Sequence, residues 1–538
     1  MKRLLILSLL HLSVVSWCAA QLSWGDQGNG TYINPVLCAD FSDPDVIRVG
    51  EKYYMVASDF HFVGMQLLES DDLVNWRIVT QVYSRFDLPG WDTNSHYAGG
   101  SWAPALRYHD GKYWIYFCTP DEGLFMTQAE RPEGPWSPLH CVKAVEKWED
   151  PCPFWDDDGQ AYLGRSRHGA GPIIVHRMSA DGRQLMDDGV TVYTGPVAEG
   201  TKFLKRNGWY YLSIPEGGVG TGWQTVLRSK NIYGPYEKRV VLEQGSTTVN
   251  GPHQGAIVQA PPSALPNKAK GEEDDWWFLH FQHDGALGRV VHLQPMHWQD
   301  DWPVIGVDID RNGIGEPVKV WTKPLPLSSP VSDKGEKADK KSVPVIPAKG
   351  YSPFTLDGKN LAPQWQWNHN PADEAWSLTE HKDQLTLHAL QADNFRQARN
   401  TLTQKVVGYE SEVTVTIDCS HLAEGGRAGL ACIGKPNVVS GIRKQDGRLC
   451  LYCGGDNEEK EVAIIGSRKI CLRLSFDMPN KQYRFAYSTD GKKFTAVGEP
   501  FFSDFANWKG VRFGLFHYNK ERSAGYVCIP WVKYEIKK

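Results

Sequence analysis

The chain has 538 residues, too many for one ordinary hydrophobic core, so two domains are the first expectation. Its composition, 41% hydrophobic and 22% charged, is that of a globular protein, and a formal charge of −5 without a basic stripe argues against a nucleic-acid partner. Aromatic residues make up 12% and include 21 Trp. Such residues suit the faces of sugars, but the cores of all-β proteins are also rich in them.

The first twenty residues predict a secretory signal peptide. Met1-Lys2-Arg3 is a basic start, a mostly apolar run follows from Leu4 to Val15, and small residues precede Gln21. We therefore expect residues 1–20 to be removed and the protein to be exported, either to the periplasm or out of the cell. No later segment is long and apolar enough to predict a membrane span.

Residues 21–323 contain the same short pattern five times, a turn followed by an aromatic strand. The strands begin near Tyr53, Tyr113, Ala161, Trp209 and Trp276. Helical periodicity is nearly absent. Short strands repeated at this period predict a five-bladed β-propeller.

Residues 324–349 are charged and rich in proline, which predicts a linker between two domains. Residues 350–538 follow, in which 409–417 and 469–476 alternate between two faces. Because this part has no repeat, we expect a two-sheet, concanavalin-like β-sandwich. Of the eleven cysteines, Cys450 and Cys453 are the one close pair. We expect buried free thiols or one or two disulfides here rather than a zinc site.

A distinctive side chain precedes each aromatic strand of the propeller. These residues are Asp43, Trp102, Asp150, Glu199 and His253. Because equivalent positions in repeats occupy equivalent places around a propeller axis, we expect the five to converge at one mouth of the central channel. Three of them are carboxylic acids, and clustered acids with separated pKa values are what glycoside hydrolysis requires. For any single one, a structural turn cap or a satisfied histidine is the alternative.

At this point the sequence resembles glycoside hydrolase family 43. The resemblance extends in order through the whole propeller. It is carried by the run from Asn34 to Met55, and by Ser70–Trp76, Ser101–Pro104, Glu199-Gly200 and Leu287–Arg289. The family is an inverting five-bladed propeller group that includes β-xylosidases and α-L-arabinofuranosidases. The C-terminal part resembles the sandwich of its xylosidase-like members, most clearly at Arg427–Leu430.

The resemblance implies a role for each matching residue. Asp43 matches the general base, Glu199 the general acid, and Asp150 the carboxylate that raises the pKa of Glu199 and orients it. Arg289 matches an arginine that holds sugar hydroxyls. His253 matches a channel histidine that contacts a structural calcium or sodium ion, usually through water. No cofactor is expected for the chemistry itself.

Two departures from the family pattern concern the sugar. The base lies in Ser-Asp43-Pro-Asp rather than the pattern common in xylosidases, and Ser58–Phe62 replaces the usual pocket wall. Phe60, His61 and Trp102 are candidate pocket walls, with core packing as the alternative for each.

The resulting hypothesis is exo-acting release of terminal α-L-arabinofuranose from plant cell-wall material such as arabinoxylan, arabinan or xyloglucan side chains. β-D-Xylosidase is the close alternative, and a non-catalytic carbohydrate-binding propeller is the alternative of another class. The sandwich is expected to shape or close the pocket.

Overall fold

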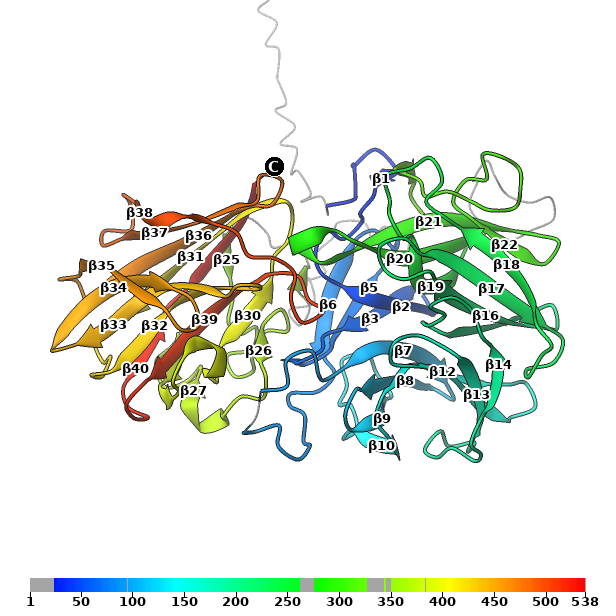
Figure 1. The fold of residues 1–538 in the computed structure, drawn as a ribbon, viewed down its shortest axis with the longest axis horizontal. Helices are drawn as coiled ribbons and strands as arrows, with labels where there is room; N and C mark the ends of the chain where they lie inside the picture. The colour runs from blue at the N-terminus through cyan, green and yellow to red at the C-terminus, as the bar shows by residue number, and fades with distance from the viewer. Residues whose placement is uncertain are drawn as a thin grey trace, which may run out of the picture.

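A computed structural model describes residues 24–93, 95–261, 275–326, 343–344, 350–382 and 384–537. The described chain is built of strands, and three 3-10 turns are its helical elements: η1 (Gly285–Leu287), η2 (Asp373–Ala375) and η3 (Phe395–Gln397). Figure 1 shows two β domains side by side, one coloured blue to green and the other yellow to red. The predicted all-β class is therefore confirmed. The signal peptide expected at residues 1–20 lies outside the described residues.

The N-terminal domain is a five-bladed propeller, as predicted. Each blade has four antiparallel strands of which the first is innermost, and in four of the five pairs of neighbouring blades these innermost strands pack against one another. Tight turns such as Asn207-Gly208 join neighbouring strands. Both residues of this turn have positive φ angles (51° and 70°), as a two-residue hairpin loop requires. The blades are β2 (Ser42–Val49), β3 (Lys52–Ser58), β5 (Gln66–Ser70) and β6 (Trp76–Gln81); β7 (Trp102–His109), β8 (Lys112–Thr119), β9 (Gly123–Ala129) and β10 (His140–Ala144); β11 (Trp148–Trp155), β12 (Ala161–Arg167), β13 (Ile173–Met178) and β14 (Val190–Tyr193); β15 (Lys202–Arg206), β16 (Trp209–Glu216), β17 (Trp223–Ser229) and β18 (Glu237–Leu242); β19 (His253–Ala260), β20 (Asp275–His283), β21 (Arg289–Gln299) and β22 (Trp302–Ile305).

The C-terminal domain consists of two nine-stranded sheets. Its alternating strands behave as the sequence predicts: Ile470, Leu472, Leu474 and Phe476 are buried on one face of β36. The first sheet contains β25 (Gly350–Ser352), β27 (Trp376–Ser377), β28 (Leu385–His388), β31 (Glu410–Asp418), β36 (Lys469–Asp477), β37 (Gln482–Ser488), β38 (Thr495–Phe501), β40 (Tyr526–Ile529) and β41 (Val532–Lys537). The second contains β4 (Phe62–Val63), β26 (Gln366–Asn368), β29 (Leu390–Gln391), β30 (Leu402–Lys405), β32 (Gly426–Ile433), β33 (Val438–Gln445), β34 (Arg448–Gly454), β35 (Glu459–Ile464) and β39 (Arg512–Asn519).

The second sheet crosses the boundary between the domains. Its strand β4 belongs to the first propeller blade by sequence, yet it pairs with β26, so that Val63 faces Trp367 across the ladder. One continuous hydrophobic core contains residues of both domains. The two domains are therefore joined through backbone pairing and a shared core, in addition to the covalent connection.

Little of the predicted linker (324–349) is described. Residues 343–344 form β24 (Val343–Pro344), which pairs with β6 at the outer edge of the first blade. A further two-stranded ribbon joins β1 (Thr31–Ile33) to β23 (Val320–Thr322), near the two ends of the propeller sequence. The domain boundaries themselves stay predictions.

The ten cysteines of the described residues are all unpaired, and Cys450 and Cys453 are among them. In this part of the chain the expectation of free thiols therefore holds over that of disulfides. A search of the described residues for helices long and apolar enough to cross a membrane finds none.

Candidate active site

A repeated backbone feature marks the start of each innermost strand. One residue there adopts a left-handed conformation, with φ between 32° and 58°, and in four blades the pairing register shifts at the same place, as in a β-bulge. The left-handed residues are Asp43, Ala103, Asp150, Gly200 and Gln254. All five blades therefore share a backbone distortion at the residues that the sequence predicts to meet at the mouth of the channel.

The five residues that the sequence predicts to be equivalent do not all occupy the same position in their blades. Asp43 and Asp150 occupy the left-handed position, whereas Trp102, Glu199 and His253 lie one residue before it. The residue that matches Glu199 in the third blade is therefore Glu149, which the sequence analysis missed. Aligning the first three repeats on Pro44, Pro104 and Pro151, each directly after the left-handed residue, pairs Glu149 with Trp102.

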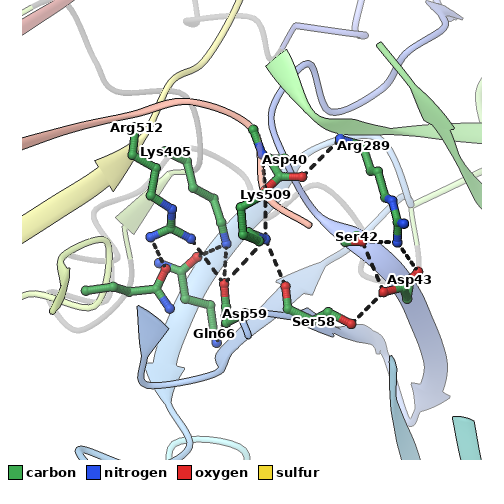
Figure 2. Close-up of polar contacts among 12 residues, drawn as sticks. Asp40, Ser42, Asp43, Ser58, Asp59, Gln66, Arg289, Lys405, Lys509 and Arg512 are labelled. Carbon is green, nitrogen blue, oxygen red and sulfur yellow. Dashed lines mark hydrogen bonds and ion pairs between the residues drawn. The ribbon is translucent and has the colours of Figure 1, made fainter. Parts of the chain in front are cut away.

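Asp43 is buried and surrounded by groups that pair with a carboxylate (Figure 2). Its Oδ1 accepts a hydrogen bond from Arg289 Nη1 at 2.8 Å. Its Oδ2 accepts from the hydroxyls of Ser58 at 2.6 Å and Ser42 at 3.0 Å. Ser58 Oγ in turn accepts the backbone N–H of Ala103 at 2.6 Å. Three donors from two blades therefore fix the orientation of this carboxylate.

The carboxyl groups of Glu199 and Asp150 lie close together, so a negative charge on one opposes ionisation of the other. Burial, followed by repulsion from Asp150 and Asp43, raises the pKa of Glu199 to about 8. Burial also raises the pKa of Asp150 to about 6, against the lowering effect of a 2.6 Å hydrogen bond from the Gly200 N–H. Glu199 is thus protonated at neutral pH, which is the state that a general acid needs.

Glu149 adds a third carboxyl group to this pair. Carboxylate oxygens of Glu149, Asp150 and Glu199 lie within 4.8 Å of one another, close enough to share a cation. Glu149 is buried and accepts the N–H of Ala170 at 3.1 Å. Burial and repulsion from Asp150 raise its pKa as well. Glu149 and Glu199 are therefore protonated at neutral pH, whereas Asp150 is largely ionised, and a protonated acid is a poor cation ligand.

Aromatic rings from both domains lie near Arg289, the partner of Asp43. The ring of Trp102, which is half-buried, lies 5.7 Å from that of Phe60 and 6.3 Å from that of Trp508. The Arg289 guanidinium lies 5.9 Å from the Trp508 ring. Trp508 belongs to the sandwich and is 43% exposed. The sandwich therefore supplies an aromatic wall that the sequence analysis did not identify.

The other two predicted residues are deeply buried. The ring of His61 contacts those of Phe62, Tyr97 and His369, which places it against the sandwich rather than among the acids. His253 Nδ1 lies 2.7 Å from the carbonyl oxygen of Gly251, and its Nε2 has no partner among the described residues. Burial lowers the pKa of His253 to about 4, so this nitrogen is a free acceptor. The ion expected near it stays a prediction.

Comparison with known families agrees with this architecture. Residues 32–303 match the family model described as Glycosyl hydrolases family 43. The chain belongs to glycoside hydrolase family 43. Residues 355–535 match the model described as Beta xylosidase C-terminal Concanavalin A-like domain, which confirms the predicted class of the second domain.

Several relatives of this family member cover most of its length. It is 56% identical to a Xylanibacter ruminicola protein named "Putative beta-xylosidase", over 91% of this chain and 87% of that one. It is 34% identical to a Formosa agariphila "Beta-xylosidase", over 95% and 92% of the two chains. A Bacteroides ovatus non-reducing end alpha-L-arabinofuranosidase is 29% identical over 66% of this chain and 65% of its own.

A solved structure also resembles the whole chain. A bifunctional GH43-CE protein of Bacteroides eggerthii superposes with a TM-score of 0.79 at 28% identity. The match covers 94% of this chain and 64% of that longer one. The chain is thus a glycoside hydrolase whose substrate is a carbohydrate, and the preference for arabinofuranoside expected from the sequence is not confirmed.

Proposed function

We propose that this protein is an exo-acting, inverting β-D-xylosidase that removes terminal xylose from xylo-oligosaccharides. The observation that carries the proposal is the contrast between two carboxyl environments. Asp43 is held by a guanidinium and two hydroxyls, whereas Glu199 is kept protonated by burial and by repulsion from neighbouring acids. Pairs of acids in such opposed environments divide the work of glycoside hydrolysis.

In the proposed reaction Glu199 donates its proton to the glycosidic oxygen as the bond to the anomeric carbon breaks. Asp43 removes a proton from a water molecule, which attacks the same carbon from the opposite face. Asp150 keeps the pKa of Glu199 high, and Arg289 binds sugar hydroxyls while it fixes Asp43. Afterwards Asp43 carries a proton and Glu199 is ionised, and exchange with solvent restores both.

The choice of sugar rests on the relatives rather than on the acids, because both candidate reactions use the same groups. Xyloside is supported by the names of relatives that match more than 85% of both chains. α-L-Arabinofuranoside is the second candidate, supported by a relative that matches two thirds of the chain. Export, expected from residues 1–20, is proposed alongside this function, since polymeric plant substrates lie outside the cell.

A side-by-side assay tests the choice. We expect kcat/KM on nitrophenyl β-D-xyloside to exceed that on nitrophenyl α-L-arabinofuranoside by at least tenfold. Asp43→Ala is the control for contaminating activity, because it should lower kcat on both substrates by several orders of magnitude. A preference for the arabinofuranoside would contradict the proposed specificity, and an active Asp43→Ala variant would remove Asp43 as the base.

A further inference from the structure

Five charged side chains are buried between the two domains (Figure 2). Asp40 and Asp59 come from the propeller, and Lys405, Lys509 and Arg512 come from the sandwich. None of the five is more than 7% exposed. Burying a charge is costly unless it is paired, so these groups stabilise one another only when the domains are docked. We call them the interdomain charge cluster.

Lys509 occupies a particular place in this cluster. It lies in the sandwich segment 502–511, directly after Trp508, and its side chain is 2% exposed. Its Nζ donates to Asp40 Oδ2 at 2.7 Å and to the carbonyl oxygen of Ser58 at 2.9 Å. A third oxygen, Asp59 Oδ1, lies 4.0 Å away. One ammonium group therefore joins two separate segments of the propeller.

Both of these segments are linked to Asp43, Ser58 by one hydrogen bond and Asp40 by two through Arg289. Ser58, whose carbonyl oxygen Lys509 binds, donates its hydroxyl to Asp43 Oδ2. Asp40 accepts the backbone N–H of Arg289 at 2.9 Å through Oδ1, and the Arg289 guanidinium donates to Asp43 Oδ1. Each carboxylate oxygen of Asp43 thus accepts a hydrogen bond from a residue that Lys509 holds, directly at Ser58 and through Asp40 at Arg289.

We propose that Lys509 is a positioning residue, through which the sandwich domain holds the catalytic carboxylate Asp43 in its productive orientation. This inference rests on the proposed role of Asp43 as base. The base must hold a water molecule in line with the anomeric carbon, and a misplacement of about 1 Å can cost about 100-fold in rate. The sandwich therefore affects the reaction in two ways: Lys509 orients the base, and Trp508 forms an aromatic wall.

Lys405 provides a matched comparison within the same cluster. It is also a buried lysine of the sandwich, and its Nζ donates to Asp59 Oδ1 at 2.8 Å and Gln66 Oε1 at 2.9 Å. Neither acceptor side chain donates to Asp43 or Arg289; Asp59 accepts the N–H of Gln66, and Gln66 donates to the carbonyl oxygen of Pro363. Loss of Lys405 should weaken the interface without releasing the base.

The test compares Lys509→Met with Lys405→Met on nitrophenyl β-D-xyloside, using the full chain. We expect Lys509→Met to lower kcat at least tenfold with KM changed by less than about threefold, and Lys405→Met to keep kcat within about threefold of the native value. Both variants should lower the unfolding temperature. Equal kcat in the two variants would overturn the inference.

A second variant separates positioning from folding. Lys509→Met leaves the Asp40 carboxylate without its cation, whereas Asp40→Asn/Lys509→Met removes both charges and keeps an oxygen for the Arg289 N–H. We expect the double variant to regain stability while kcat stays at least tenfold low. Recovery of kcat together with stability would mean that Lys509 acts only on folding. Asp43→Ala is measured alongside: if it is inactive while Lys509→Met is fully active, this inference fails but the proposed base does not.

Discussion

Asp43 and Asp150 share an unusual backbone conformation, with φ angles of 56° and 55°. An L-residue in the left-handed region costs about 1–2 kcal/mol, and such strain persists where the surroundings fix it. At Asp43 the fixing partners are Arg289, Ser58 and Ser42, and at Asp150 they include the Gly200 N–H. The same backbone conformation therefore occurs at two carboxyl groups that have different hydrogen-bond partners.

The role of Asp150 can be tested through the pH dependence of kcat/KM on xylobiose, a substrate whose leaving group needs the acid. Activity is lost as pH rises through the pKa of Glu199, which is raised to about 8 by burial and then by Asp150. Asp150→Asn removes that negative charge but keeps an oxygen for the Gly200 N–H. The pKa of Glu199 should then fall, and the basic limb should move to lower pH by about one unit.

Glu149→Gln is the matched control for this experiment. Glu149 also has a carboxylate oxygen within 4.8 Å of one of Glu199, but burial and repulsion from Asp150 and Glu199 raise its own pKa to about 9, so it carries little charge where Glu199 titrates. Its removal should shift the basic limb less than Asp150→Asn does. An unchanged limb in Asp150→Asn, or a larger shift in Glu149→Gln, would show that a different carboxyl group tunes the acid.

At the scale of secondary structure, strand β4 is the element that joins the two domains. Phe62 in this two-residue strand is 2% exposed and packs in a cluster with Phe395, Phe516 and Tyr518 of the sandwich. The Arg512 guanidinium lies 3.6 Å from the centre of its ring. A propeller side chain thus fills part of the sandwich core and covers one cation of the interdomain charge cluster.

We expect Phe62→Ala to lower the free energy of unfolding by about 3–5 kcal/mol, the usual cost of deleting a buried phenyl ring. Urea unfolding followed by tryptophan fluorescence measures this change. Val462→Ala, on the outer strand β35 with 39% exposure, is the control and should stay within about 0.5 kcal/mol. A cost below about 1 kcal/mol for Phe62→Ala would mean that β4 contributes little to joining the domains.

At the scale of the whole molecule, the sandwich places side chains beside the candidate active site of the propeller. Consecutive residues of one sandwich segment have different tasks: Trp508 lies beside Trp102 and Arg289, and Lys509 enters the interdomain charge cluster. The shared hydrophobic core extends through both domains. Trp508 and Lys509 are thus the residues through which we expect the sandwich to shape the pocket.

The sequence predicted those features that depend on local patterns. Five turn-and-strand repeats indicated five blades, and the alternation at 469–476 indicated a strand with one buried face. The residues Asp43, Asp150 and Glu199 could be found because each lies 10 or 11 residues before an aromatic strand. This spacing does not separate Asp150 from its neighbour Glu149, whereas the left-handed residue, which all five blades share, shows that Glu149 matches Glu199.

Contacts between distant segments could not be predicted in this way. The β4–β26 pairing joins residues about 300 apart, and Lys509 reaches Ser58 across 451 positions of sequence. No periodicity links such segments, and a lone lysine or a two-residue strand carries no pattern of its own. His61 illustrates the same limit, because its burial against His369 of the sandwich depends on how the domains pack.

The central claim is that Asp43 and Glu199 act on opposite faces of a β-xyloside. Proton NMR recorded during the first minutes of xylobiose hydrolysis tests it most directly. Attack by an Asp43-activated water inverts the anomeric centre, so the signal of α-D-xylose should appear first and the β-anomer should grow later by mutarotation. β-D-Xylose as the first product would contradict the account.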